Sequence, residues 1–91
     1  MEFEWDEAKN RTNIYKHGVS FETARRIFEG PVLSWLDVRY NYGEDRHISM
    51  GSVGAGALLV VAYTIRNGSI RLISARPATR KEWQVYHEKT R

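Results

Sequence analysis

The dipeptide Asn67-Gly68 constrains the fold of this chain more than any other local feature. It separates two apolar segments, residues 57–66 and 69–76. Asn-Gly is typical of the two-residue type I′ turn, in which both residues take positive φ, and it predicts a β-hairpin. The turn also sets an expected register. In that register Arg66 faces Ser69, Tyr63 faces Leu72 and Leu59 faces Arg76.

The segments before the hairpin predict one short strand and two helices. Residues 1–5 alternate as a strand does, and Asp6 is a suitable N-cap for a helix that continues to about Lys16 and ends at Gly18. Ser20 begins a second helix, which ends at Glu29-Gly30-Pro31.

The rest of the chain predicts three more strand segments and a last helix. Residues 32–37, 46–53 and 57–66 are expected to be strands, with a polar loop at 38–45 and a flexible connection at 51–56. Thr79 to Glu82 fits a capping box that opens the final helix. The predicted order is β-α-α-β-β-β-β-α. This is a small α+β fold with an antiparallel sheet packed with helices, and residues 1–91 are expected to form a single domain.

The composition indicates a globular protein of the cytoplasm. Hydrophobic residues make up 42% and charged residues 27%, and there is no cysteine. A small chain without disulfides is typical of a reducing compartment. The longest mainly apolar run, residues 55–63, is about half of the ~20 residues that a membrane-spanning helix needs. We expect no interaction with a membrane.

Positive charge is concentrated at the end of the chain. Residues 66–91 hold seven Arg and Lys against two Glu, a net charge of +5, whereas residues 1–65 have a net charge of −2. Most of these cations are arginines, whose forked donors suit bidentate contact with phosphate. The asymmetry predicts contact with nucleic acid.

Sequence blocks in order along nearly the whole chain resemble the BrnT family, the toxin half of a bacterial type II toxin–antitoxin pair. The blocks are residues 3–9, Asn13, residues 16–22, Ala24, Phe28, residues 43–46, Gly51, residues 60–66, residues 71–76, Ala78, Glu82 and Tyr86. The most specific part is the combination of Lys-His-Gly-Val-Ser-Phe at 16–21 with Ile-Ser-Ala-Arg at 73–76. One departure is the connection at 54–57, which has no basic residue where many relatives place a charge.

The resemblance implies a RelE-like fold and a metal-independent endoribonuclease that cleaves mRNA and inhibits translation. It also implies a ribbon-helix-helix antitoxin (BrnA-like) that blocks the toxin. The two would form a 2:2 complex that binds operator DNA through the antitoxin.

Cleavage of RNA without a metal requires deprotonation of a 2′-hydroxyl, stabilisation of the phosphorane charge and protonation of the leaving oxygen. Arg76 is the first candidate for charge stabilisation, because it ends a strand just before a helix N-terminus. Its structural alternative is an ion pair with an acidic residue that holds the helix in place. Arg66 and Arg46 are the next candidates, with Arg46 expected near Arg66. Strand alternation places Arg66 and Arg76 on opposite faces and roughly 23 Å apart, so only a bulge or a strong twist would let them act together.

Three further residues are candidates for proton transfer or RNA contact, each with a structural alternative. His17 suits acid–base chemistry, but a cation at a helix C-terminus also stabilises the helix. Tyr86 suits proton donation or stacking on a base, or a place in the core. Glu82 suits a general base, or only the capping box.

The remaining cationic candidates, Lys16, Arg71, Arg80 and Lys81, are expected to guide RNA, unless they are simply solvated. Trp5, Trp35 and Trp83 are expected in the core. The spacing of His47 and His87 matches no metal site, and we expect no metal and no cofactor.

Two other functional classes stay open at this point. The chain is alternatively a non-catalytic RNA- or protein-binding module with a basic C-terminal face, which the products of an RNA incubation would distinguish. A third possibility is a pure interaction protein with an apolar interface and no affinity for RNA.

Overall fold

The computed structural model describes residues 1–90 and contains the predicted elements in the predicted order. The strands are β1 (Glu2–Glu4), β2 (Val32–Leu36), β3 (His47–Ser52), β4 (Leu58–Arg66) and β5 (Ser69–Pro77). The helices are α1 (Glu7–His17), α2 (Phe21–Ala24), the 3-10 helix η1 (Arg25–Glu29) and α3 (Arg80–Lys89). No helix within residues 1–90 has the length and apolar character needed to cross a membrane.

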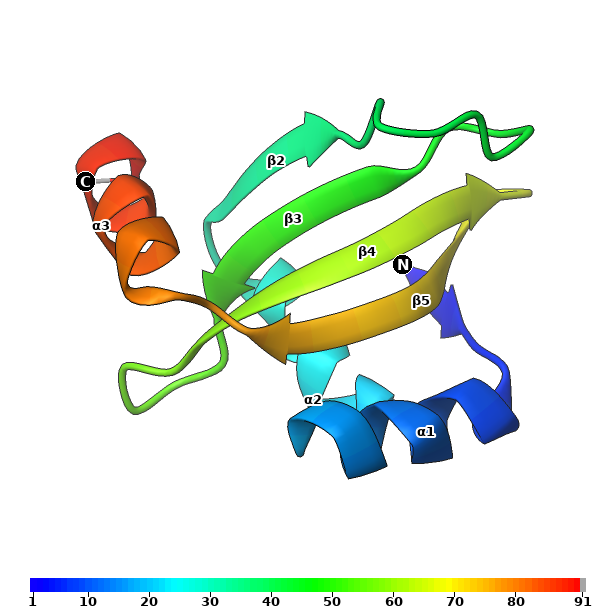
Figure 1. Ribbon diagram of the computed structural model, residues 1–91, viewed down its shortest axis with the longest axis horizontal. Helices are drawn as coiled ribbons and strands as arrows, with labels where there is room; N and C mark the ends of the chain where they lie inside the picture. The colour runs from blue at the N-terminus through cyan, green and yellow to red at the C-terminus, as the bar shows by residue number, and fades with distance from the viewer. Residues whose placement is uncertain (91) are drawn as a thin grey trace.

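The five strands form one sheet in the order β1-β5-β4-β3-β2, as Figure 1 shows. The long strands pair antiparallel, which confirms the α+β class predicted from the sequence. Only β1 departs from the antiparallel pattern. It pairs in parallel with the first residues of β5 and leaves the rest of that strand's outer edge uncovered by β1.

α1, α2 and η1 cover one face of the sheet. Asp6 caps α1 by accepting from the backbone N–H of Ala8, and Gly18 ends that helix with φ of 70°. Phe21 and Ile27 of the following helices are fully buried against Val61 of β4 and its neighbours, and this is the main core. The predicted cap residues Asp6, Gly18 and Ser20 all occupy their expected positions.

Asn13 fastens α1 to the exposed edge of β5. Its side-chain amide donates to the carbonyl oxygens of Val19 at 2.8 Å and of Ala75 at 2.7 Å, and its oxygen accepts from the Ala75 N–H at 3.1 Å. The side chain is buried and satisfies three backbone groups that lie outside the helix. These bonds fix where the C-terminal end of α1 lies beside the sheet.

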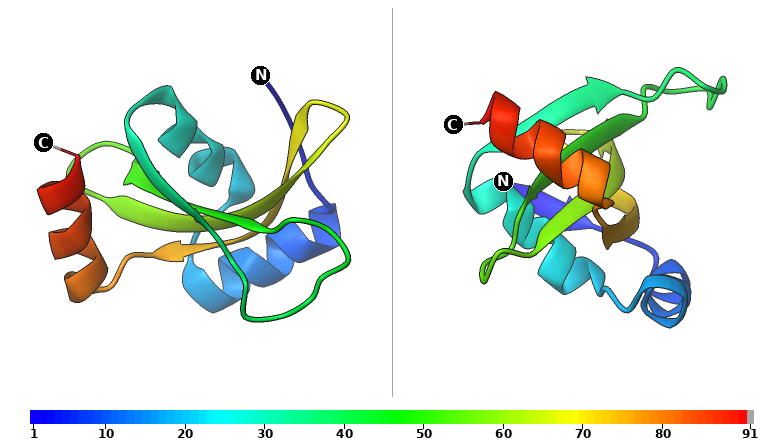
Figure 2. Two further views of the ribbon diagram at one scale, coloured as in Figure 1. Left: turned by 90° about the horizontal axis from the view of Figure 1, so that it is seen from above. Right: turned by 60° about the vertical axis from the view of Figure 1, so that its left-hand side comes forward.

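α3 covers one end of the opposite face. Both views of Figure 2 show this helix apart from α1, at the end where β5 leaves the sheet. The capping box at Thr79 and Glu82 is present as predicted. Tyr86 anchors the helix by packing with Met50, Leu58 and Val60. The rest of this face has no helix over it, and we call it the open face.

The hairpin register is as predicted near the turn and changes beyond it. Asn67 and Gly68 have φ of 53° and 80°, as a type I′ turn requires. Arg66 pairs with Ser69 and Tyr63 with Leu72, but the register then shifts, so that Ala62 pairs with Ser74 and Ile73 has no partner of its own. Leu59 therefore faces Pro77, and the prediction that it faces Arg76 was wrong.

Candidate functional site

The bulge at Ile73 decides on which face Arg76 lies. Arg76 pairs with Val60, and Arg66 follows Val60 on β4 by an even number of residues. Since side chains alternate along a strand, both arginines belong to the open face, and the prediction of opposite faces was wrong. They remain apart, because Arg66 lies six positions along β4 from Val60, which is roughly 20 Å.

The open face holds a groove of about 460 Å³ that lies over β2 to β5 beside the loop that joins β2 to β3. We call it the sheet-face groove. It is lined by Trp35, Leu36, Asp37, Val38, Arg39, Arg46, Ile48, Val60, Ala62, Ser74 and Arg76. Two of the predicted catalytic arginines, Arg46 and Arg76, therefore line the same groove.

Arg76 is held by Glu82 of α3. Its two terminal nitrogens donate to the two carboxylate oxygens at 2.8 and 2.9 Å. This bidentate contact, together with the N–H of Thr79 at 2.8 Å, lowers the pKa of Glu82 to about 2. Glu82 also occupies the N-terminus of α3, where we expected an anion to be favoured. A phosphate that approaches Arg76 must therefore compete with a carboxylate of the same chain.

Arg46 is the cation of the groove that lacks a carboxylate partner among residues 1–90. Its guanidinium carbon lies 4.4 Å from the centre of the Tyr42 ring, so the group is held by a cation–π contact. Its Nε is buried and has no hydrogen-bond partner within the described residues. A buried donor without an acceptor costs stability.

Asp37 and Arg39 form a third part of the groove that sequence reasoning missed. The Asp37 side chain is 3% exposed and accepts from Arg39 Nε and Nη2, each at 2.9 Å, and from the Tyr42 hydroxyl at 3.0 Å. The Arg39 guanidinium is the main reason that the pKa of Asp37 falls far below its usual value. The only sequence signal was an Asp and an Arg two residues apart in a loop.

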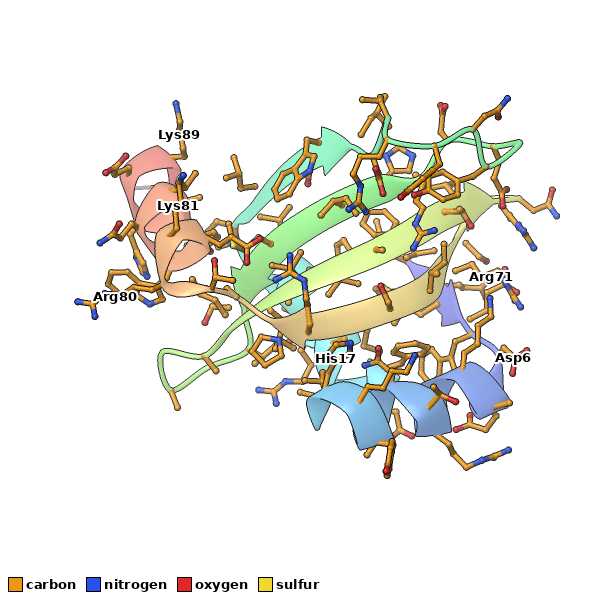
Figure 3. The ribbon with its side chains drawn as sticks, in the orientation of Figure 1. Asp6, His17, Arg71, Arg80, Lys81 and Lys89 are labelled. Carbon is orange, nitrogen blue, oxygen red and sulfur yellow. The ribbon has the colours of Figure 1, made fainter. Side chains whose placement is uncertain are left out.

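His17 and Lys16 lie beside a second, smaller groove of about 300 Å³ between α1 and the edge of β5. We call it the α1–β5 groove. Ser74 lines both grooves, so they meet across the edge of β5. The His17 and Lys16 side chains are exposed. Figure 3 shows His17 at the end of α1, next to β5.

Tyr86 lies in the core. It is 5% exposed and its hydroxyl donates to the carbonyl oxygen of Pro31 at 2.8 Å. A ring in this position cannot stack on RNA unless α3 moves. The structure therefore places Tyr86 as an anchor of α3, which was the alternative in the sequence analysis.

The other predicted cations lie away from the sheet-face groove. Arg66 pairs with Glu44 at 2.7 Å, and Arg71 pairs with Glu4 at 3.2 Å. Figure 3 shows Arg80 and Lys81 on α3 and Arg71 at the opposite end of the sheet. The predicted RNA-guiding residues therefore do not form one surface.

Two of the three tryptophans are not core residues. Trp5 packs edge-on against Phe21, as expected. Trp35 and Trp83 are 43% and 46% exposed, so the prediction for these two was wrong. Trp35 is outside the core because β2 is an edge strand and the open face above it is uncovered.

No group of three His, Cys, Asp or Glu side chains within residues 1–90 is arranged to hold a metal ion. Most of the charged side chains that line the sheet-face groove are arginines. These offer phosphate-binding groups on an open sheet surface, next to an exposed histidine.

A fold of this kind with an arginine-lined groove defines a small protein suited to binding phosphate groups along a strand of nucleic acid. Residues 5–82 match the family model described as the ribonuclease toxin, BrnT, of type II toxin–antitoxin systems, and the chain belongs to this family. The family assignment confirms the resemblance seen in the sequence, and it implies an RNA target and an antitoxin partner.

A solved structure shares the fold. The chain superposes on the crystal structure of the Brucella abortus ribonuclease toxin, BrnT, with a TM-score of 0.64 and 24% sequence identity. The match covers 88% of this chain and 99% of the Brucella chain. A comparison with curated proteins finds no match.

Proposed function

We propose that this protein is a RelE-like, metal-independent endoribonuclease that cleaves mRNA in the cytoplasm and thereby stops translation. The family, named for ribonuclease toxins, supports the class of reaction. The observation that carries the proposal is the placement of Arg46 and Arg76 in one open groove. The sheet-face groove is where a phosphodiester would be bound.

The reaction uses groups of the RNA itself. The 2′-hydroxyl loses its proton and its oxygen attacks the adjacent phosphorus, while the bond from phosphorus to the 5′-oxygen breaks. The leaving oxygen takes a proton. The products end in a 2′,3′-cyclic phosphate and a 5′-hydroxyl.

Arg46 and Arg76 stabilise the charge that gathers on the phosphorane oxygens. Groups already aimed at that position contribute most, because they need little rearrangement when the charge develops. Arg46 is held against Tyr42 without a carboxylate partner within residues 1–90, and it makes the first contact. Arg76 joins when phosphate takes the place of the Glu82 carboxylate.

His17 is proposed for proton transfer. Histidine is a common general acid and base in enzymes, and His17 is exposed at the α1–β5 groove, which meets the sheet-face groove at Ser74. Glu82 is a poor general base, because a group with a pKa of about 2 accepts protons weakly at neutral pH. His17→Ala should therefore lower the rate and remove the limb of the pH–rate profile that belongs to an imidazole.

The proposed partner is a ribbon-helix-helix antitoxin. A 2:2 complex would bind operator DNA through the antitoxin, and its formation would block access of RNA to the toxin. Co-purification with a ribbon-helix-helix protein, followed by sedimentation to give the mass, tests this arrangement.

Incubation of the purified chain with RNA tests the activity. Arg46→Ala and Arg76→Ala should each lower the cleavage rate by about 100-fold or more, as removal of a charge-stabilising donor does. Arg25→Ala is the matched control, because Arg25 is exposed on η1 under the opposite face. Its cleavage rate should equal that of the unaltered chain. RNA left intact by the unaltered chain, or equal loss in all three variants, would contradict the proposal.

A second candidate is an RNA-binding module that does not cleave. It is favoured by one observation, which is that the sheet-face groove itself offers no group suited to proton transfer at neutral pH: Glu82 is locked to Arg76, and Asp37 to Arg39. Salt-sensitive binding without a 2′,3′-cyclic phosphate product would support the module.

A further inference from the structure

The Trp35 side chain lies on the open face, and its ring stacks on no other aromatic ring within residues 1–90. The residue is 43% exposed and lines the sheet-face groove. Among residues 1–90 it makes no ring–ring contact and its indole N–H donates to no acceptor. In contrast, the Trp5 indole donates to Glu7 at 3.0 Å and the Trp83 ring lies 4.0 Å from that of His87.

The sheet register places Trp35 at one end of a row that crosses four strands. The row consists of Trp35, Ile48, Ala62 and Ser74, each paired with the next. The side chains of Ala62 and Ser74 are small, so the floor of the groove is low on β4 and β5. The four strands of this row span roughly 14 Å. The large indole of Trp35 borders the groove on the β2 side.

The arginines flank this row. Arg76 belongs to the row of Met50 and Val60, two residues along the strands in one direction. Arg46 precedes β3 and lies two residues before Ile48, in the other direction. An exposed aromatic ring thus lies between two cationic positions of one groove.

We propose that Trp35 is a stacking subsite for one unstacked base of a single-stranded RNA, whose flanking phosphates contact Arg46 and Arg76. Stacking on an aromatic ring accepts any base, because every base has a π-face, and it favours single strands over duplexes. The inference rests on the proposed function, since it assigns the nucleotide contacts of the same groove. Trp35 binds substrate and takes no part in proton transfer.

A protein partner is the competing occupant of Trp35. Leu33 and Val85 continue an apolar surface from Trp35 towards α3. RNA is favoured because the indole shares its groove with Arg39, Arg46 and Arg76, and a ring between cations suits a phosphate-bearing ligand.

The test measures binding of a mixed-sequence 2′-O-methyl oligoribonucleotide, which cannot be cleaved, and of an abasic strand of the same length. Trp35→Ala should weaken binding of the base-bearing strand by about 5- to 150-fold. Binding of the abasic strand should not change. Trp35→Phe should keep most of the affinity, because a phenyl ring still stacks. Trp83→Ala is the matched control, an equally exposed tryptophan on α3, and should bind as the unaltered chain does.

Several results overturn the stacking subsite. Equal binding of the base-bearing strand by Trp35→Ala and the unaltered chain would do so. Equal loss of both strands would also do so, because it would mean that Trp35 supports the groove and does not stack on a base. Loss of antitoxin binding with RNA binding intact would assign Trp35 to a protein interface. If the unaltered chain cleaves RNA and Trp35→Ala cleaves it at the same rate, the stacking subsite is wrong and the proposed function stands. Failure of the unaltered chain to bind either strand overturns the proposed function as well.

Discussion

Glu82 controls how much of the Arg76 charge is available to a ligand. Its carboxylate holds both terminal nitrogens of Arg76 and also accepts from the Thr79 N–H. A glutamine at this position keeps the capping box and loses the charge. Glu82→Gln should therefore release Arg76, tighten RNA binding by roughly fivefold and cost about 1 kcal/mol or less in stability.

Fluorescence anisotropy with a labelled, non-cleavable RNA measures this effect. Glu88→Gln on the same helix is the control, because Glu88 is exposed and makes no ion pair within residues 1–90. If Glu82→Gln instead abolishes cleavage while binding stays constant, Glu82 acts as the general base and the role assigned to His17 is wrong.

For single residues, the sequence predicted which residue types belong to the candidate site better than it predicted their contact partners. Arg76 and Glu82 were both candidates, but no local sequence pattern paired them, because the contact joins the end of β5 to the first turn of α3. Trp35 was expected in the core because tryptophan is usually buried. Its exposure depends on β2 being an edge strand, which a single strand's pattern does not reveal.

Among the elements, α1 depends on one buried side chain for its place beside β5. Asn13→Ala leaves two carbonyl groups and one N–H without their partner. We expect a loss of about 2–4 kcal/mol in the free energy of unfolding, because each buried polar group without a partner costs about 1–3 kcal/mol. Urea denaturation measures this loss.

Tyr15→Ala on the same helix is the control, since Tyr15 is 92% exposed and should change stability by less than about 0.5 kcal/mol. A loss for Asn13→Ala no larger than that of Tyr15→Ala would show that α1 is held in place mainly by its apolar contacts.

Local signals predicted the element boundaries well. Asp6, Gly18, Ser20 and Thr79 mark helix ends through bonds to residues within four positions, and Asn67-Gly68 sets its own turn. The parallel pairing of β1 and the shift at Ile73 were not predictable in this way. Both depend on how distant segments pack on the two faces of the sheet.

For the whole molecule, paired carboxylates make stability depend on acid pH. Hydrogen bonds from Arg76 lower the pKa of Glu82 to about 2, and Arg39 and Arg66 lower the pKa values of Asp37 and Glu44. A carboxylate with a depressed pKa stabilises the fold above its unfolded pKa, and this contribution is lost as pH falls through the folded value. Stability should be constant from about pH 7 to 5 and fall between about pH 4.5 and 2.

Urea midpoints measured across this range test the expectation. Asp37→Asn should be less stable at neutral pH and should show a shallower decline in acid, because one of the linked carboxyls is gone. A flat profile between pH 5 and 2.5 in the unaltered chain would contradict the ion pairs described at Glu82 and Asp37.

The unpaired Ile73 sets the direction of the Arg76 side chain. At the present chain length, a strand without the bulge would alternate regularly and point the Arg76 guanidinium at the helices instead of the groove. Deletion of Ile73 should remove the bulge and restore regular alternation, and Arg76 would then stay on the groove side of the sheet. The extra residue and the face of Arg76 are therefore coupled, and a scan that only substitutes residues would not detect this coupling.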